Sequence, residues 1–221
     1  FDWLTYSSPC QDFSRAGLMK GGIEGSGTRS SLLWQIRKAV EIKRPRVMIL
    51  ENVSDLVSKR FKGAFDEWIK CLECYGYRNY WNVINAVDHG IPQNRKRVYM
   101  VSILGEGKEF KFPKPQFGML SLRSIMESQA PECLYKDLNR IPCVLTYNNS
   151  SLRVKQATKT GYADVRQGGV FDVAFPNSKT RRGRVQGVDG DICPTLTASS
   201  SDSILLFDKG RARSLTSKEK L

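Results

Sequence analysis

The stretch VMILENV, residues 47–53, decides the fold class of this 221-residue chain. It begins two residues after Pro45, runs through four apolar residues and then presents the carboxylate of Glu51. A short and nearly continuous apolar run is typical of a strand buried in a parallel sheet, here with a polar group at its tip. We therefore predict an α/β fold in which the strand ends collect the functional residues.

The segments around this strand alternate between helical and strand patterns. Apolar residues recur at helical spacing in SLLWQIRKAVEIKR (31–44), which ends before Pro45, and in FDEWIKCLECYGY (65–77). Two further strands are predicted from YWNVINAVD (80–88) and RVYMVSIL (97–104), joined through the polar stretch HGIPQNRK. This alternation supports the α/β prediction for the first half of the chain.

The chain opens with FDWLTYSS, which we interpret as another strand, and Pro9 and Cys10 follow where that strand ends. A cysteine held at a strand end faces the crevice in which open α/β sheets bind ligands, and its thiolate can act as a nucleophile. A free cysteine near a strand end can also be a simple packing residue. This stretch alone leaves both interpretations open.

From about Phe112 the composition and the hydrophobic pattern of the sequence change. Helical periodicity disappears, and short β-type runs such as GVFDVAF (169–175) and SILLF (203–207) stand between turn residues. We predict a second, smaller lobe that is mostly β-structure and rich in loops.

The charge balance points to a polyanionic partner. Thirty-five Lys and Arg against 22 Asp and Glu give a net charge of +13, divided almost evenly between residues 1–112 and 113–221. This spread excludes a single basic tail and suits nucleic acid, although a merely soluble basic surface is the alternative. KTRRGR (179–184) suits a phosphate backbone through Arg181, Arg182 and Arg184, and a solvated loop is its alternative.

Other features bound the location and the cysteine chemistry. No run approaches the roughly 18 apolar residues of a membrane span, and the N-terminus lacks a signal-peptide pattern, so we expect a cytoplasmic protein. The six cysteines are expected to be free thiols. Cys71 and Cys74 form a single CxxC on a predicted helix, and we interpret them as structural and expect no metal site.

Four side chains are expected to meet at one edge of the sheet. Cys10 and Glu51 end two strands, and Arg95 and Arg97 stand at the turn into a third, so a parallel sheet would bring them to its carboxyl edge. A thiolate can attack an electron-poor ring, a protonated carboxyl can hydrogen-bond a ring nitrogen, and guanidinium groups can hold a carbonyl oxygen or phosphate. Alone, Glu51 is also explained as the partner of a following helix and the arginines as a solvated turn.

The motifs around these residues resemble those of the DNA (cytosine-5)-methyltransferases. PCQ at 9–11, ENV at 51–53 and QNRKR at 93–97 match that family's PCQ, ENV and QxRxR motifs in order and at similar spacing. PTLT at 194–197 is similar to the Thr-Leu element of the target-recognition region, and RSLTSKE at 213–219 is similar to the RxLTxxE element that follows it, with Ser where Pro is usual. The resemblance covers the whole chain.

The resemblance implies a reaction on duplex DNA. Cys10 would attack C6 of a flipped cytosine, Glu51 would hydrogen-bond the N3 edge of the ring, and Arg97, supported by Arg95, would hold the O2 side. The base that removes the C5 proton is not identified.

The resemblance also implies the cofactor, the partner and the contacts. S-adenosyl-L-methionine would be the cofactor, and double-stranded DNA the partner of a monomeric protein that does not act at membranes. The setting would be restriction-modification or phage DNA protection in a prokaryotic or phage-encoded enzyme. The residues carried over are Pro9 and Leu32 for the cofactor and Gln11, Arg181, Arg182, Arg184, Thr195 and Leu196 for DNA.

The implied organisation is a Rossmann-like methyltransferase sheet with a target-recognition lobe. We expect a partial catalytic α/β domain at 1–111, the recognition lobe at 112–210 and the start of a return to the catalytic domain at 211–221. The family's Phe-x-Gly-x-Gly cofactor loop and its Asn-rich closing segment are not among these 221 residues. We therefore expect a central fragment that by itself binds S-adenosyl-L-methionine weakly or not at all.

Two other functions stay open. A catalytically silent nucleic-acid-binding protein would keep the basic surface and the recognition lobe. Methylation of RNA cytosine is the second alternative, because the family includes an RNA-acting branch.

Overall fold

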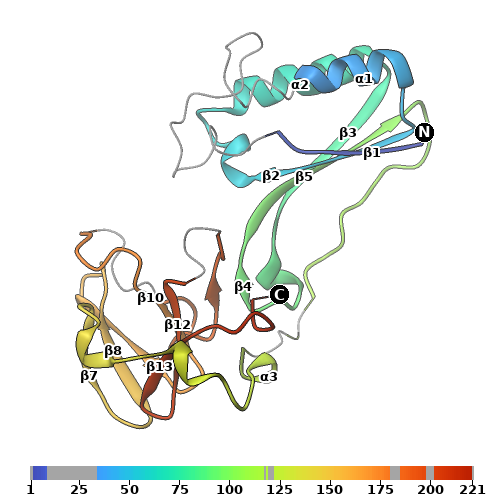
Figure 1. The fold of residues 1–221 in the computed structure, drawn as a ribbon. Helices are drawn as coiled ribbons and strands as arrows, with labels where there is room; N and C mark the ends of the chain where they lie inside the picture. Colours follow the sequence, from blue (N-terminus) through green and yellow to red (C-terminus); the bar gives the residue numbers. More distant parts are fainter. Residues whose placement is uncertain are drawn as a thin grey trace. The chain divides into compact units, whose positions relative to one another are not determined.

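The computed structural model consists of two compact units (Figure 1). Unit 1 comprises Phe1–Asn85 and Lys96–Lys114, and unit 2 comprises Ala86–Arg95 and Pro115–Leu221. The structure describes residues 2–8, 34–116, 118, 122–179, 185–197 and 202–220. No helix among these residues is long and apolar enough to cross a membrane.

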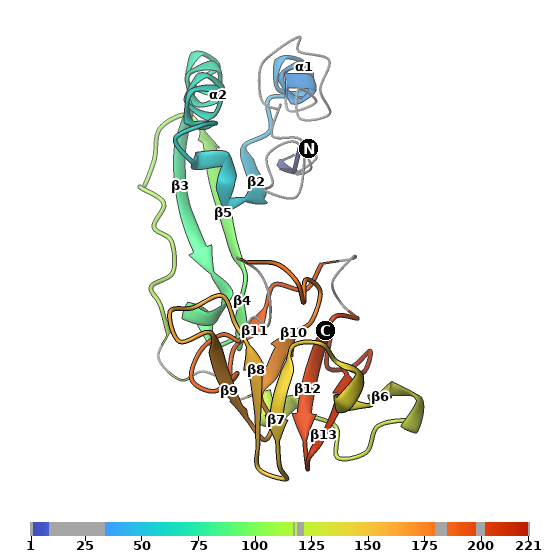
Figure 2. The ribbon, with the colours of Figure 1, turned by 90° about the vertical axis from the view of Figure 1, so that its left-hand side faces the viewer.

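Unit 1 is a four-stranded sheet with two helices on one of its faces (Figure 2). The strand order is β1-β2-β5-β3. The strands are β1 (Trp3–Tyr6), β2 (Val47–Val53), β3 (Tyr77–Asn85) and β5 (Lys96–Leu104), and the helices are α1 (Gln35–Lys43) and α2 (Lys62–Cys74), with a short 3-10 helix η3 (Ser54–Val57) after β2.

The expected parallel sheet is wrong for one strand, because β5 runs opposite to the other three. β2 runs parallel to β1, as predicted, but antiparallel to β5, and β3 is also antiparallel to β5. Parallel neighbours need a crossover of a dozen or more residues, usually a helix. Only residues 86–95 connect β3 to β5, so these two strands pair as the arms of a long hairpin.

The predicted elements of unit 1 agree with the structure at their centres and differ at their ends. β2 has the predicted bounds, and β3 begins three residues earlier than expected and gives way to the 3-10 helix η4 (Ala86–His89). Helix α2 begins three residues before Phe65. The first three residues of the helix predicted at 31–44 lie outside the described residues.

The core of unit 1 lies between the sheet and the helices. Met48 and Leu50 alternate along β2 and are fully buried, because they face Phe65, Trp68 and Leu72 of α2. Fully burying side chains of this size contributes about 1.5–3 kcal/mol each. This core holds the end of β2 in place and therefore the residues of the ENV motif.

We predict that Tyr6→Phe destabilises the protein by about 1–3 kcal/mol. The Trp68 indole N–H donates to the Tyr6 hydroxyl at 3.0 Å inside this core, so removal of the hydroxyl leaves a buried donor unpaired. Urea unfolding measures the loss. The matched control is Tyr162→Phe, because Tyr162 is an exposed tyrosine. Equal midpoints for the two variants would contradict the prediction.

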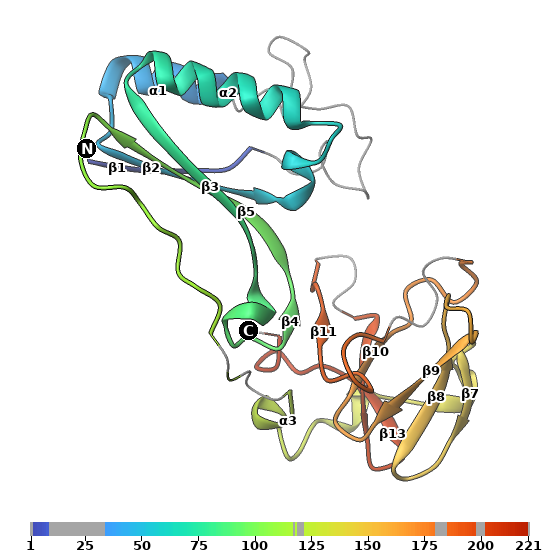
Figure 3. The same cartoon turned by 180° about the vertical axis from the view of Figure 1, so that it is seen from behind.

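Unit 2 is built mainly from short antiparallel strands (Figure 3). Its sheets have the orders β10-β12-β13-β6, β7-β8-β9 and β11-β4. The strands are β4 (Gln93–Asn94), β6 (Tyr135–Lys136), β7 (Val144–Tyr147), β8 (Ser151–Lys155), β9 (Tyr162–Arg166), β10 (Val170–Asp172), β11 (Cys193–Pro194), β12 (Ile204–Asp208) and β13 (Arg211–Ser214). The helical segments are η4, α3 (Leu122–Ile125), η5 (Glu132–Leu134) and η6 (Leu138–Arg140).

β12 is an interior strand of the sheet β10-β12-β13-β6 and is buried on both faces. Leu205 and Phe207 pack into a core shared with β8 and β9, whereas Ile204 and Leu206 pack into a second core that includes Leu215. Two-sided burial explains why SILLF is apolar at successive positions instead of alternating.

Unit 2 includes segments from two separate parts of the sequence. Residues 86–95 belong to unit 2, although they interrupt the sequence of unit 1. Residues 211–214 form β13, which pairs with β12 and β6 inside unit 2.

Candidate active site

The described part of the site in unit 1 centres on an ion pair at the end of β2. Arg97 Nε lies 3.0 Å from Glu51 Oε1, with side chains 17% and 40% exposed, respectively. In the antiparallel register Arg97 stands opposite Val53, so Glu51 is its diagonal neighbour on the same face of the sheet. Because Met48 and Leu50 occupy the helix-covered face, strict alternation places Glu51 on the other face.

Asn52 connects the ends of the two parallel strands. Its side-chain N–H donates to the Ser8 carbonyl at 3.1 Å and to Ser8 Oγ at 3.0 Å, and its Oδ1 accepts from the Val53 N–H. Asn52 and Ser8 are 1% and 4% exposed, so these hydrogen bonds take the place of hydration that burial removes. The backbone is therefore fixed up to the residue before Pro9.

Arg95 is placed in unit 2 and Arg97 in unit 1. Arg95 and Leu196 line the same cavity of about 430 Å³ within unit 2, together with apolar side chains of α3, β11 and β12. Thr195 Oγ1 donates to the carbonyl of Asn94 at 2.5 Å. The structure thus brings the first three residues of QNRKR, Gln93–Arg95, together with the Thr-Leu element in unit 2, although Asn94 and Thr195 are 101 positions apart.

The remaining predicted site residues lie outside the described residues. They are Pro9, Cys10, Gln11, Leu32, Arg181, Arg182 and Arg184. Of the CxxC cysteines, Cys71 packs against the core of unit 1 and Cys74 is exposed at the end of α2.

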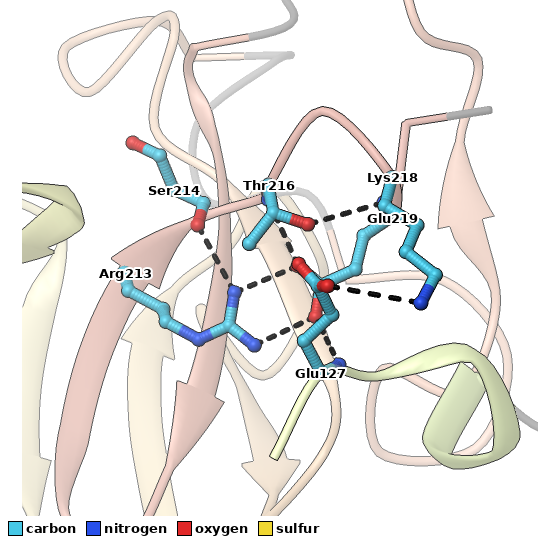
Figure 4. A network of polar contacts seen from close by, with 6 residues as sticks. All are labelled: Glu127, Arg213, Ser214, Thr216, Lys218 and Glu219. Carbon is cyan, nitrogen blue, oxygen red and sulfur yellow. Dashed lines mark hydrogen bonds and ion pairs between the residues drawn. The ribbon is translucent and has the colours of Figure 1, made fainter. Parts of the chain in front are cut away.

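A buried ion pair organises the C-terminal part of unit 2 (Figure 4). Arg213 donates to both carboxylate oxygens of Glu219 at 2.7 Å, and the two side chains are 1% and 2% exposed. The backbone N–H groups of Thr216 and Glu127 also donate to Glu219, at 2.9 and 2.8 Å. The carboxylate therefore ties β13, the following turn and the segment after α3 together.

The same contacts shift the acid–base properties of the pair. Burial alone would raise the pKa of Glu219, but the hydrogen bonds from Arg213, Thr216 and Glu127 outweigh it and lower that pKa to about 2. The hydrogen bond to Glu219 raises the pKa of Arg213. Both groups are therefore held in their charged forms.

The sequence matches the family model of the C-5 cytosine-specific DNA methylases over residues 1–221. The chain belongs to this family. Membership explains why PCQ, ENV, QNRKR, Thr-Leu and RxLTxxE occur in this order.

Individual methylases are similar over different lengths. Type II methyltransferase M2.ScrFI of Lactococcus lactis subsp. cremoris is 46% identical over 141 residues, which are 64% of this chain and 39% of that protein. Orphan methyltransferase M.SssI of Spiroplasma monobiae is 34% identical over 227 residues, covering 99% of this chain and 53% of its own length. The chain thus spans about half, or less, of these curated relatives.

Solved methyltransferase structures share the fold. The Entamoeba histolytica methyltransferase EhMeth has a TM-score of 0.58 at 17% identity and covers 99% of this chain and 63% of its own. A putative DNA modification methyltransferase encoded within an Escherichia coli prophage has a TM-score of 0.56 at 14% identity, covering 99% and 66%. The predicted fold class, part of a methyltransferase α/β sheet with a mostly β lobe, is confirmed.

The sequence analysis assigned no separate role to several residues that make buried or inter-segment hydrogen bonds in the structure. Asn52 is the middle residue of ENV, and its position next to Glu51 could have indicated that it holds the end of the strand in place. The pairing of Arg213 with Glu219 could have been anticipated, because these residues are the two charged ends of the RxLTxxE element. Gln186, which contacts Asn94, had no signal in the sequence.

We predict that Glu219→Gln destabilises unit 2 by about 3–5 kcal/mol, because it leaves Arg213 buried without its counter-charge. The exposed Glu132, which pairs with Arg211, offers a matched control. Glu132→Gln should cost less than about 1 kcal/mol. Chemical denaturation of both variants measures the difference between their free energies of unfolding. Similar losses of stability would contradict the prediction that the buried pair matters more than the exposed one.

The same pair gives a pH dependence with a defined sign. Because the folded-state pKa of Glu219 lies below its ordinary value of 4.5, its contribution is full above that value and is lost as pH falls toward about 2. The Glu219→Gln variant should lack this component.

Proposed function

We propose that the protein methylates cytosine at C5 in double-stranded DNA, within a restriction-modification system. The observation that carries the proposal is the Glu51–Arg97 ion pair at the end of β2, in a chain of the cytosine-specific methylase family. A carboxyl group and a guanidinium group on one face of a sheet can together engage the polar edge of a pyrimidine ring.

In the proposed reaction, the Cys10 thiolate adds to C6 of a cytosine that has left the duplex. Protonated Glu51 donates a hydrogen bond to N3, and Arg97, with Arg95 in support, holds the O2 side. C5 gains the nucleophilic electron pair and takes the methyl group. Loss of the C5 proton to a base then re-forms the C5–C6 double bond and expels Cys10.

S-adenosyl-L-methionine supplies the methyl group as a sulfonium when bound, and Pro9 and Leu32 would contact it. The fit rests on the backbone that precedes Pro9: Ser8 is buried and its carbonyl and hydroxyl accept hydrogen bonds from Asn52, so the chain reaches Pro9 from a fixed position. A rigid strand end of this kind suits a wall between the cofactor and the reacting base.

The proposal predicts a covalent complex with fluorinated DNA. A C6 adduct that has received the methyl group cannot lose fluorine from C5 as it would a proton, so Cys10 stays attached. A denaturing gel of the full-length protein with cofactor and a duplex containing 5-fluorocytosine should show a slow band. Cys10→Ser should abolish the band and methyl transfer, while DNA binding remains largely intact.

Each other outcome of the gel has a defined meaning. A band only on fluorinated RNA would assign the protein to RNA cytosine methylation, and no band on any substrate would indicate a silent binding protein. Turnover by Cys10→Ser would refute the nucleophile. Cys74→Ser is the matched control, because Cys74 is an exposed cysteine on α2.

We also predict that the affinity for duplex DNA falls steeply between low and physiological salt. A chain of net charge +13 neutralises DNA phosphates when it binds, and this releases the counterions that were condensed on the DNA. Replacing Arg181, Arg182 and Arg184 by alanine should lower the slope of log K against log salt by about 0.9 for each phosphate that these arginines neutralise. Fluorescence anisotropy at several salt concentrations measures the slope.

The control for this experiment removes the same charge from unit 1. Three exposed lysines serve for it, namely Lys38, Lys43 and Lys59. If both triple variants change the slope equally, the 181–184 segment makes no specific contribution to the interface.

A further inference from the structure

Residues 86–95 carry Arg95 and are fastened to unit 2 by strand pairing. β4 and β11 run side by side as a parallel pair (Figure 3), with Gln93 opposite Cys193 and Asn94 opposite Pro194. The Cys193 N–H also donates to the carbonyl of Pro92 at 2.8 Å. A two-residue ladder is too short to be stable alone, so further contacts must hold this segment.

Asn94 supplies two of those contacts, one from its side chain and one from its backbone. Its Nδ2 donates to Gln186 Oε1 at 2.8 Å, and its carbonyl accepts from Thr195 Oγ1 at 2.5 Å. Arg95 follows directly, and its own backbone is bonded on both sides: its N–H donates to the Gln93 carbonyl, and its carbonyl accepts from the Ala86 N–H. The hydrogen bonds of Asn94 therefore fix the backbone position from which the Arg95 side chain extends.

Gln186 is itself held rigidly. The Gln156 side chain makes two hydrogen bonds to the backbone of the preceding residue, Val185, at 3.1 and 3.4 Å. The Gln186 carbonyl accepts from the Ile192 N–H, which closes the turn between them. Gly187 lies in that turn at φ +69°, where a Cβ would collide with Asp191 and Ile192. The turn thus presents the Gln186 amide to Asn94 at a fixed place.

We propose that Gln186 is a positioning residue that, through Asn94, sets the placement of Arg95 for the reaction. This inference rests on the proposed function. It means that Arg95 is held in place by hydrogen bonds made within unit 2. Gln186 touches neither the substrate nor the reacting atoms in this role.

The chemistry of the two amides allows a sharp test. Each amide has both a donor and an acceptor, so Asn94→Asp still accepts from a flipped Gln186, and Gln186→Glu still accepts from Asn94. The double variant places two carboxylates together and has no donor left. Each single variant should therefore keep the hydrogen bond, and only the double variant should break it.

The experiment uses two readouts on the full-length protein. Hydrogen exchange of the peptide covering residues 86–95 should stay near wild type in N94D and Q186E and rise about tenfold in N94D/Q186E. Methylation of duplex DNA should show the same pattern, with kcat lowered about tenfold in the double variant and KM for DNA nearly unchanged, because phosphate contacts elsewhere supply most of the affinity.

The charge-matched control is N82D/Q129E, which adds two negative charges at exposed amides. It should leave both readouts unchanged. Unaltered exchange in N94D/Q186E would overturn the hydrogen bond, and faster exchange with unaltered kcat would overturn the positioning role. A wild-type protein that methylates neither DNA nor RNA would refute the proposed function and with it this role, while the exchange pattern would still decide the hydrogen bond.

Discussion

The antiparallel register between β2 and β5 determines the described part of the candidate site. Because β5 begins where β2 ends, Arg97 lies beside Val53 and reaches Glu51 across the sheet. The β2–β5 ladder ends at Arg97, the β3–β5 ladder continues to Lys96, and Arg95 already belongs to unit 2. A shift of one residue would turn Glu51 toward the helices and move Met48 and Leu50 out of the core, so burial enforces the register.

The ion pairs Glu51–Arg97 and Arg213–Glu219 differ in how deeply they are buried. Glu51 is 40% exposed, so its carboxylate is open to a ligand and its pairing with Arg97 contributes little to stability. Arg213 and Glu219 are almost completely buried and fully hydrogen-bonded, so the loss of either partner leaves an isolated charge. The exposed pair is accessible to a ligand, whereas the buried pair fixes the architecture of unit 2.

The sequence allowed prediction of what depends on local pattern. The bounds of β2 followed from an apolar run after Pro45, and the helices followed from 3.6-residue periodicity. Strand direction did not follow, because an apolar run is equally compatible with a parallel neighbour on one side and an antiparallel one on the other. The hydrogen bond between Asn94 and Gln186 was also unpredictable, since it joins residues 92 positions apart through two ordinary amides.

The most direct test of the account is whether the Glu51 carboxyl acts on the base. Duplex DNA whose cytosines carry tritium at C5 releases one tritium into water with each methyl transfer, so release measures turnover in the full-length protein. Glu51→Gln should lower that rate by about 10²-fold or more, as expected for the loss of a general acid, while the exposed Glu109→Gln should not change it. Tritium release by Glu51→Gln at the wild-type rate would contradict the central role of this residue.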